Sequence, residues 1–281
     1  MSAFSTTEHL LANAAGREYR LRVWRPEQAD PAARVKTLLF LDGHWLDETL
    51  GPALDRVAPG GLQIASLGYR TADRVTLAPW RAYDYTPVGP RGLQCDPRKT
   101  EWPCGGASQL LDFLRQQVLP RLAPAVSPAP ASVALFGHSY AGLFSLYSWL
   151  EAPSLFSRIY SASPSLWWYW PHMLALLQAR HPGNQLDTAN STPVHLFVGS
   201  DERWRPLPAV PGAPREPGVS TVPFAQRFHA ALQASGHEGA SLRILAGQAH
   251  GPMLHSAARC ALDHFLTAAA PLGLASKRDP S

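Results

Sequence analysis

The chain has 281 residues, of which 46% are apolar, and a formal net charge of +4. This length is sufficient for one large core, and the basic residues are spread along the chain, which argues against a nucleic-acid-binding surface. Every apolar run is far shorter than the ~18 residues that a membrane-spanning helix needs. We therefore expect one domain over residues 1–281, with its core at about 18–268 and a disordered tail at 270–281.

Strand-like and helix-like segments alternate along the chain. Residues 18–24 alternate polar and apolar side chains, as a half-buried edge strand does. Short apolar runs bounded by turn residues predict buried central strands at 35–41, 62–67, 132–136, 194–198 and 241–245. Helical apolar spacing follows at 46–57, 108–122, 142–150, 171–179, 223–235 and 254–268. This alternation predicts an α/β fold, with a mostly parallel sheet, helices on both faces and a ligand site at the carboxyl ends of the strands.

Ser139 lies at the expected turn between a strand and a helix, in the sequence G-H-S-Y-A. Such a turn holds the serine in a strained conformation and brings the residues two before and two after it close together, so both must be small. Gly137 and Ala141 meet this requirement, although Ala141 replaces the second glycine of G-x-S-x-G. The motif predicts a nucleophile, but a Gly/Ser turn that merely caps a helix has the same pattern.

A serine hydroxyl needs a general base that reaches it. In α/β hydrolases the serine is followed along the chain by the acid and then the histidine, each on a loop after a later strand. His250 follows the strand predicted at 241–245, and Asp201 and Glu202 follow the strand at 194–198. The order therefore predicts a Ser139–His250 pair with Glu202 or Asp201 as the third member.

Two further positions fit an oxyanion hole. His44 follows the strand at 35–41, where this fold offers a backbone N–H to the developing oxyanion, and the N–H of Tyr140 is the second expected donor. We assign this role to the amide of His44 and not to its imidazole. His138 is expected to support the strand end.

The three cysteines, Cys95, Cys104 and Cys260, fit no metal-binding spacing. Cys95 and Cys104 are close enough in sequence to form a loop disulfide in an oxidising compartment, whereas Cys260 is expected to be a buried helix residue. No metal or other cofactor is predicted. The N-terminus lacks the features of a secretion signal, so we expect a cytoplasmic protein; a periplasmic protein whose leader has been removed would read the same way.

Four sequence blocks carry a family resemblance: RAYDYTP at 81–87, GHSYAGLF at 137–144, YSASPSLWW at 160–168 and HGPM at 250–253. Together they resemble the bacterial siderophore esterases that hydrolyse the trilactone of enterobactin-type catecholates, within the putative-esterase branch of α/β hydrolases. The similarity in blocks and order extends from about residue 35 to residue 268.

The resemblance implies that Ser139 is the nucleophile, that His250 is the base, and that Arg81 lies near the bound ester. Some members of this group are regarded as working with a Ser-His pair alone, while many relatives carry an acid in a G-x-x-[DE] turn. Residues 199–202 fit that turn with Glu202 at the acidic place, and Asp201 remains the alternative.

The substrate implied by the resemblance is a small-molecule ester, specifically a catecholate siderophore that is strongly anionic when it holds iron. Such a ligand requires arginines and aromatic faces. Arg81 can instead pair with Asp84 or another carboxylate and only hold its loop. The candidates for substrate contact are Arg81, Tyr83, Trp45 and Trp167, with a basic loop of Arg91, Arg98 and Lys99, Arg74 upstream, and further tryptophans at 80, 102, 168, 170 and 204.

Two alternatives remain open from the sequence. The chain fits a general acyl or feruloyl-type carboxylesterase, because its Trp167–Trp170 cluster and its proline-rich segment after Trp204 depart from the siderophore esterases. It also fits a catalytically silent α/β-hydrolase module that only binds a ligand. The oligomeric state is not predicted.

Overall fold

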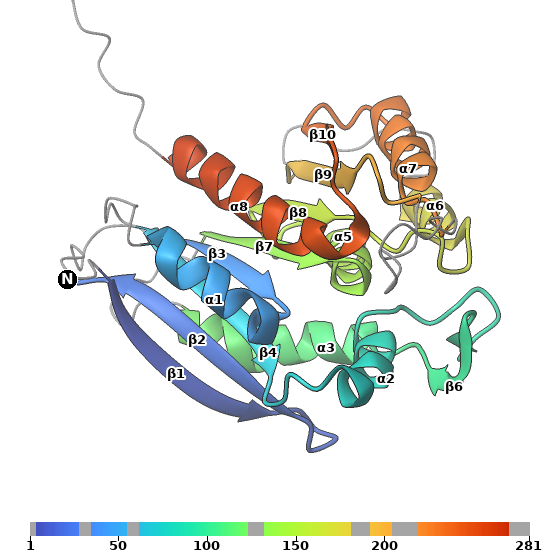
Figure 1. Ribbon diagram of the computed structural model, residues 1–281. Coiled ribbons are helices and arrows are strands. Elements are labelled where there is room, and N and C mark those ends of the chain that lie inside the picture. Colours follow the sequence, from blue (N-terminus) through green and yellow to red (C-terminus); the bar gives the residue numbers. More distant parts are fainter. Residues whose placement is uncertain are drawn as a thin grey trace, which may run out of the picture.

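The computed structural model describes residues 4–27, 35–54, 62–122, 132–180, 192–203 and 218–269. An eight-stranded sheet has the order β1-β2-β4-β3-β7-β8-β9-β10 (Figure 1). The six strands from β4 to β10 in this order are parallel, and β2 and β1 continue the sheet as antiparallel strands. The strands are β1 (Phe4–Ala12), β2 (Glu18–Pro26), β3 (Lys36–Leu41), β4 (Leu62–Tyr69), β7 (Ser132–His138), β8 (Arg158–Ala162), β9 (Val194–Gly199) and β10 (Ala240–Leu245).

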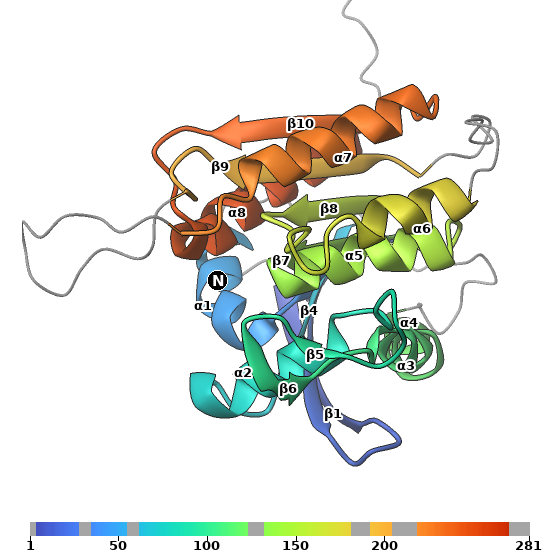
Figure 2. The same ribbon diagram turned by 90° about the vertical axis from the view of Figure 1, so that its right-hand side faces the viewer.

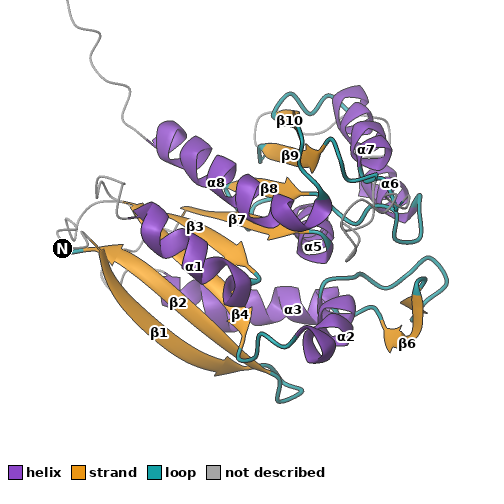
Figure 3. Cartoon of the chain, viewed as in Figure 1, coloured by secondary structure: helices purple, strands orange, loops and turns teal. Residues whose placement is uncertain are grey.

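Helices cover both faces of the sheet, as Figure 3 shows. Successive residues of a strand point to opposite faces. Along β3, Leu38 and Phe40 accordingly pack in one core cluster, with α1 (Gly43–Leu54) and α8 (His250–Ala269). Leu39 and Leu41 pack in the other cluster, which contains residues of the helices α2 (Arg74–Asp84), α3 (Ala107–Phe113), α5 (Tyr140–Glu151), α6 (His172–Arg180) and α7 (Val222–Ala234). The predicted α/β-hydrolase architecture is confirmed.

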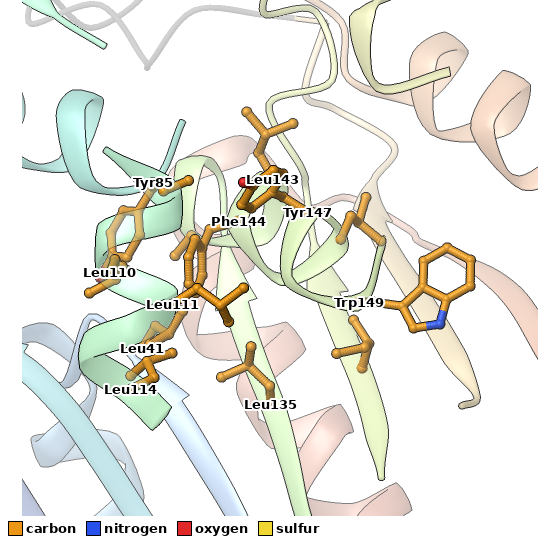
Figure 4. Close-up of a cluster of buried hydrophobic side chains, with 14 of the residues drawn as sticks. Leu41, Tyr85, Leu110, Leu111, Leu114, Leu135, Leu143, Phe144, Tyr147 and Trp149 are labelled. Atoms are coloured by element: carbon orange, nitrogen blue, oxygen red, sulfur yellow. The ribbon is translucent and has the colours of Figure 1, made fainter. Parts of the chain in front are cut away.

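The helix α5 lies at the centre of the second core cluster. Phe144 of α5 lies beside Leu111 of α3, above Leu135 of β7 (Figure 4). Almost every residue of α5 is buried, so packing around this helix fixes the turn at its start. A π-helical stretch (Leu114–Val118) and the short α4 (Leu119–Leu122) continue α3.

The sheet edges differ from the sequence prediction. Residues 18–24 were expected at an edge of the sheet, but β1 pairs with β2 on its outer side. Neither β1 nor β8 was predicted from the sequence. The strand β10 was expected to be central, yet it is the outer strand beyond β9, with Ile244 45% exposed. An apolar run of five residues does not distinguish a buried strand from an edge strand whose apolar side chains are only partly covered.

The sequence prediction also missed the helix α2, which contains Pro79. Asp73 caps its N-terminus, because the carboxylate accepts hydrogen bonds from the backbone N–H groups of Val75 and Thr76. The proline- and glycine-rich stretch that follows contains a hairpin of β5 (Cys95–Asp96) and β6 (Lys99–Pro103), which Figure 2 shows beside α2.

The cysteines are free in the structure. Cys95 is exposed and Cys104 is buried, without a bond between them, and Cys260 is half-buried in α8 where full burial was expected. In the described part of the chain, no helix combines the length and the apolar character that crossing a membrane requires. The expected tail at 270–281 lies outside the described residues, and the single-domain assignment stays a prediction.

Candidate active site

Ser139 occupies a sharp turn between β7 and α5, with φ of 61° and ψ of −116°. This positive φ is strained for a residue with a side chain. A Cβ added to Gly137 would come within 2.1 Å of the carbonyl oxygen of Ala141, so only glycine fits two residues before the serine. Ala141 is fully buried, and the turn therefore accommodates the extra methyl group at this position.

His250 bridges the serine and a carboxylate. Its Nε2 lies 3.0 Å from Oγ of Ser139, and its Nδ1 lies 3.0 Å from Oε2 of Glu202. The three residues come from the carboxyl ends of β7, β9 and β10, which the parallel sheet places side by side. With the Nδ1–H donated to Glu202, the lone pair of Nε2 is directed at the serine hydroxyl.

The carboxylate of Glu202 is fully enclosed by donors. Its Oε1 accepts hydrogen bonds from the Ser163 hydroxyl and, at 2.6 Å, from the backbone N–H of Gly199, and its Oε2 accepts one from the Thr221 hydroxyl. Burial raises the pKa of this carboxyl, but the hydrogen bond and charge of His250 and the two hydroxyls outweigh it, so the net pKa is lowered. Ser163 lies in the block at 160–168 that carries the family resemblance but was given no role of its own, and Thr221 was not identified, because a single hydroxyl residue carries no spacing signal.

Asp201, the alternative acid, has other partners. Its Oδ1 accepts a hydrogen bond of 3.0 Å from the Ser200 hydroxyl, and its backbone N–H donates to the carbonyl of Gln248. The geometry therefore pairs His250 with Glu202 and not with Asp201.

His138 contacts the backbone of His250, the proposed base. It is buried, and its Nε2 lies 3.0 Å from the carbonyl oxygen of His250. Burial lowers the pKa of His138 well below its usual value, and the positive charges of His250 and Arg81 lower it further. The ring is therefore neutral and donates its Nε2–H to that carbonyl.

Ser139 and His250 line an open cavity of about 300 Å³. Three arginines, two tryptophans and two histidines contribute to the lining. The residues are Trp45, Arg74, Ala78, Arg81, Arg98, Trp102, His138, Ser139, Tyr140, His250, Gly251 and Leu254. A second cavity of about 700 Å³ shares Trp45, Arg74, Gly251 and Leu254 with the first.

Arg81 lines the cavity, but its guanidinium is bound to the protein. Its Nε and Nη2 donate to the two carboxylate oxygens of Asp42 at 2.9 and 2.7 Å, and Nη2 also lies 3.4 Å from the carbonyl of His138. Asp42 is fully buried, and the Arg81 side chain is 12% exposed. The carboxylate partner is thus Asp42 and not Asp84, which instead accepts hydrogen bonds from Arg17, Tyr19 and Tyr69.

The other predicted substrate contacts divide into two groups. Trp45 lines the cavity, whereas Trp167 lies behind Arg98, whose guanidinium carbon is 4.2 Å from the centre of the indole ring. Tyr83 is not in the lining: its hydroxyl is 3.3 Å from Oε1 of Gln109, on the side of α2 that faces α3. The lining also excludes Arg91 and Lys99, and Trp204 lies outside the described residues.

The two expected oxyanion donors begin helices at this end of the sheet. Tyr140 is the first residue of α5, and His44 is the second residue of α1. A Cβ on Gly68 would lie 2.4 Å from the backbone nitrogen of His44, so this glycine lets the start of α1 approach β4.

The His44 imidazole accepts a hydrogen bond of 3.3 Å from the Tyr69 N–H through Nδ1, and burial lowers its pKa to about 4. The ring is thus neutral, with Nδ1 engaged and the proton on Nε2, a buried atom that has no hydrogen-bond partner among the described residues. The sequence analysis assigned the oxyanion role to the amide of His44. That role stays a prediction. Among the described residues, no group of three or more histidine, cysteine or acidic side chains has the arrangement of a metal site.

A family model described as "Putative esterase" matches residues 12–209. The chain belongs to the putative esterase family. The chain is 31% identical over 204 residues to the siderophore enterobactin esterase of Emericella nidulans, a match that covers 64% of this chain and 66% of the relative. It is 32% identical over 178 residues to the apo-salmochelin esterase of an Escherichia coli O6:H1 strain, covering 59% and 52% of the two chains.

The matched regions thus span from about half to just under two thirds of these curated relatives. The similarity to solved structures is more extensive. The siderophore hydrolase EstA from Aspergillus nidulans superposes with a TM-score of 0.74 at 25% identity and covers 94% of this chain and 95% of its own. The enterobactin and salmochelin hydrolase IroE superposes with a TM-score of 0.67 at 25% identity over 95% of this chain and 96% of its own.

Proposed function

We propose that this protein is a serine esterase and that its substrate is the ester backbone of a catecholate siderophore. The proposal depends on one observation: hydrogen bonds connect Ser139 through His250 to Glu202, and Ser139 and His250 line a cavity. The arginines and tryptophans of the same cavity support the substrate class, as do the names of the relatives.

In the first half of the reaction, Oγ of Ser139 attacks the ester carbonyl carbon while Nε2 of His250 takes the hydroxyl proton. Glu202 holds the Nδ1–H and stabilises the imidazolium that forms. The backbone N–H groups of His44 and Tyr140 bind the oxyanion of the tetrahedral intermediate. His250 then gives its proton to the departing alcohol oxygen, which leaves an acyl group on Ser139.

In the second half, a water molecule takes the place of the alcohol. His250 removes a proton from it as it attacks the acyl carbon, and the second tetrahedral intermediate collapses with return of the proton to Ser139. The lowered pKa of Glu202 keeps this carboxyl ionised at neutral pH, so it accepts the Nδ1–H throughout the cycle.

The lining of the site supports the substrate class. The 300 Å³ cavity adjoins the 700 Å³ cavity along Trp45 and Arg74, which gives a bulky ester further space. The Arg74 guanidinium carbon lies 5.1 Å from the centre of the Trp45 ring. Indole faces and guanidinium groups suit planar anionic rings.

Product analysis tests the proposal directly. Purified enzyme and the Ser139→Ala variant are incubated with a cyclic catecholate trilactone, with and without iron, and with p-nitrophenyl acetate, and the products are identified by mass spectrometry. We expect cleavage of the trilactone by the wild type only. Cleavage of p-nitrophenyl acetate without cleavage of the trilactone would indicate a general or feruloyl-type esterase, and turnover of no ester would indicate a silent binding module.

The cytoplasmic location remains a proposal. The three free cysteines are consistent with a reducing compartment. Fractionation of cells that produce the native gene product tests this, and recovery in the periplasmic fraction would contradict it.

A further inference from the structure

We propose that Arg98, on the hairpin of β5 and β6, is the residue that selects anionic substrates. This inference rests on the proposed esterase function. The family resemblance placed Arg81 near the bound ester, whereas the contacts of Arg98 favour it as the residue that binds the anionic group. It follows from a comparison of the three arginines that line the cavity of Ser139, namely Arg74, Arg81 and Arg98.

The charge of Arg81 is already compensated. Two of its nitrogen atoms donate to the fully buried carboxylate of Asp42, and the side chain is 12% exposed. A guanidinium that is bidentately paired in this way gains little from a second anion, because the carboxylate repels that anion. Arg81 therefore serves the architecture of the cavity.

Arg74 has the opposite character. It is an exposed residue at the start of α2, and its guanidinium rests over Trp45 at 5.1 Å from the ring centre. Its charge contributes to the general field of the cavity, but a long exposed side chain loses conformational entropy when it orders around a ligand.

Arg98 combines exposure with a fixed position. Its side chain is 49% exposed, and its guanidinium carbon lies 4.2 Å from the ring centre of Trp167. Its Nη2 donates to the hydroxyl of Tyr140 at 2.8 Å, and its Nε lies 3.4 Å from the carboxylate of Asp96. Neither bond involves Nη1, so its two N–H groups are available to a ligand.

Asp96 is the anchor of this arrangement. It is fully buried, and its carboxylate accepts hydrogen bonds from the Tyr140 hydroxyl and, at 2.7 Å, from the backbone N–H of Arg98. These bonds connect the hairpin to the residue that follows the nucleophile. Arg98 is thus tied to the residue next to Ser139, while half of its side chain stays exposed.

The hairpin also contributes Trp102 to the cavity lining. A planar anion beside Arg98 would meet two kinds of group that suit it, the N–H donors of Nη1 on a charged guanidinium and an indole face. The chemical class that this part of the cavity fits is a carboxylate or catecholate on an aromatic ring.

A matched pair of esters tests the inference without any siderophore. The acetate esters 4-acetoxybenzoate and 4-acetoxybenzamide have nearly the same size, and only the first is anionic. In the Arg98→Ala variant, we expect kcat/KM for the anionic ester to fall about 10-fold more than that for the neutral ester, mainly through KM. Arg98→Lys should recover part of this difference, and raising the salt concentration should reduce it.

Lys99→Ala is the matched control, because it removes one positive charge from the next position of the same hairpin, outside the cavity lining. The ratio of the two esters should remain that of the wild type in this variant. Equal losses on both esters in Arg98→Ala would overturn the inference, as would a change of the ratio in Arg74→Ala but not in Arg98→Ala.

A binding measurement covers the case in which neither acetate is hydrolysed. Quenching of tryptophan fluorescence by 2,3-dihydroxybenzoate reports binding without turnover, and we expect Arg98→Ala to raise the Kd about 10-fold. An unchanged Kd would refute the role of Arg98. If the ester ratio responds to Arg98 but no trilactone is cleaved, the proposed substrate fails while this inference stands.

Discussion

The two sides of the cavity are built in different ways. The floor, which consists of Ser139, His250, Glu202 and His138, lies at the ends of β7, β9 and β10 and is fixed by the register of a parallel sheet. The wall, which consists of Arg81 of α2 with Arg98 and Trp102 of the β5–β6 hairpin, stands on segments outside the main sheet. In the proposed mechanism, the reacting groups therefore lie at the ends of the central strands, whereas the proposed substrate contacts lie on segments that the main sheet does not fix.

The largest effect is expected from the floor. Ser139→Ala removes the nucleophile, and kcat should fall by at least ~10³-fold while the melting temperature stays within a few degrees of the wild type. Steady-state kinetics on p-nitrophenyl acetate and a thermal melt measure both quantities. Turnover near the wild-type level in a folded variant would show that Ser139 is not the nucleophile.

The second prediction separates the two acids. Glu202→Gln should reduce kcat by ~10²-fold or more, because the amide no longer fixes the tautomer of His250 or stabilises its positive charge. Asp201→Asn, the neighbouring control, should have little effect, since Asp201 hydrogen-bonds Ser200 and not His250. If both variants retain wild-type kcat, the enzyme works with a Ser-His pair alone.

The third prediction concerns Arg81 of the wall. Arg81→Ala leaves the buried Asp42 carboxylate without its cationic partner, so the free energy of unfolding should fall by about 3–5 kcal/mol. Hydrolysis of anionic and neutral esters should decrease by similar factors. Urea unfolding and the two rates are measured on one preparation, with Arg74→Ala as the exposed control for the unfolding measurement.

A stable Arg81→Ala variant that loses activity only toward the anionic ester would contradict this account. In that case Arg81, and not Arg98, would bind the anionic group of the ester.

The smallest expected effect is a pH dependence from His138 of the floor. Burial places the pKa of His138 in the folded protein below its unfolded value of about 6.5, so the folded state binds fewer protons. The corresponding stability is present above that pH and is lost as the pH falls below it. His138→Gln should therefore weaken the loss of stability between pH 7 and pH 5, by at most about 2 kcal/mol.

Urea unfolding at a series of pH values measures this difference between His138→Gln and the wild type. Parallel curves for the two proteins would show that His138 is not held neutral by burial.

The floor was predictable from the sequence, whereas the wall was largely not. Ser139, His250 and the acidic pair follow strands with strong apolar runs, and the order Ser, acid, His needs no knowledge of distances. The choice between Glu202 and Asp201 required the structure, because adjacent residues point in different directions. The family resemblance is confirmed by the family match.

The wall has weaker signals. The helix α2 contains Pro79, which argues against a helix, and the hairpin strands are only two and five residues long. The Asp73 cap and the amphipathic spacing of α2 were local signals that could have identified this helix. The partner of Arg81 could not be deduced, because Asp42 lies 39 residues away along the chain.

Labelling with a fluorophosphonate, followed by mass spectrometry of the digested protein, tests the central claim most directly. Such reagents form a stable bond only with an activated serine. The account predicts one adduct, on Ser139, that is absent in Ser139→Ala and forms much more slowly in His250→Ala. An adduct on Ser165, whose hydroxyl lies 3.3 Å from that of Ser139, or the absence of any adduct, would contradict it.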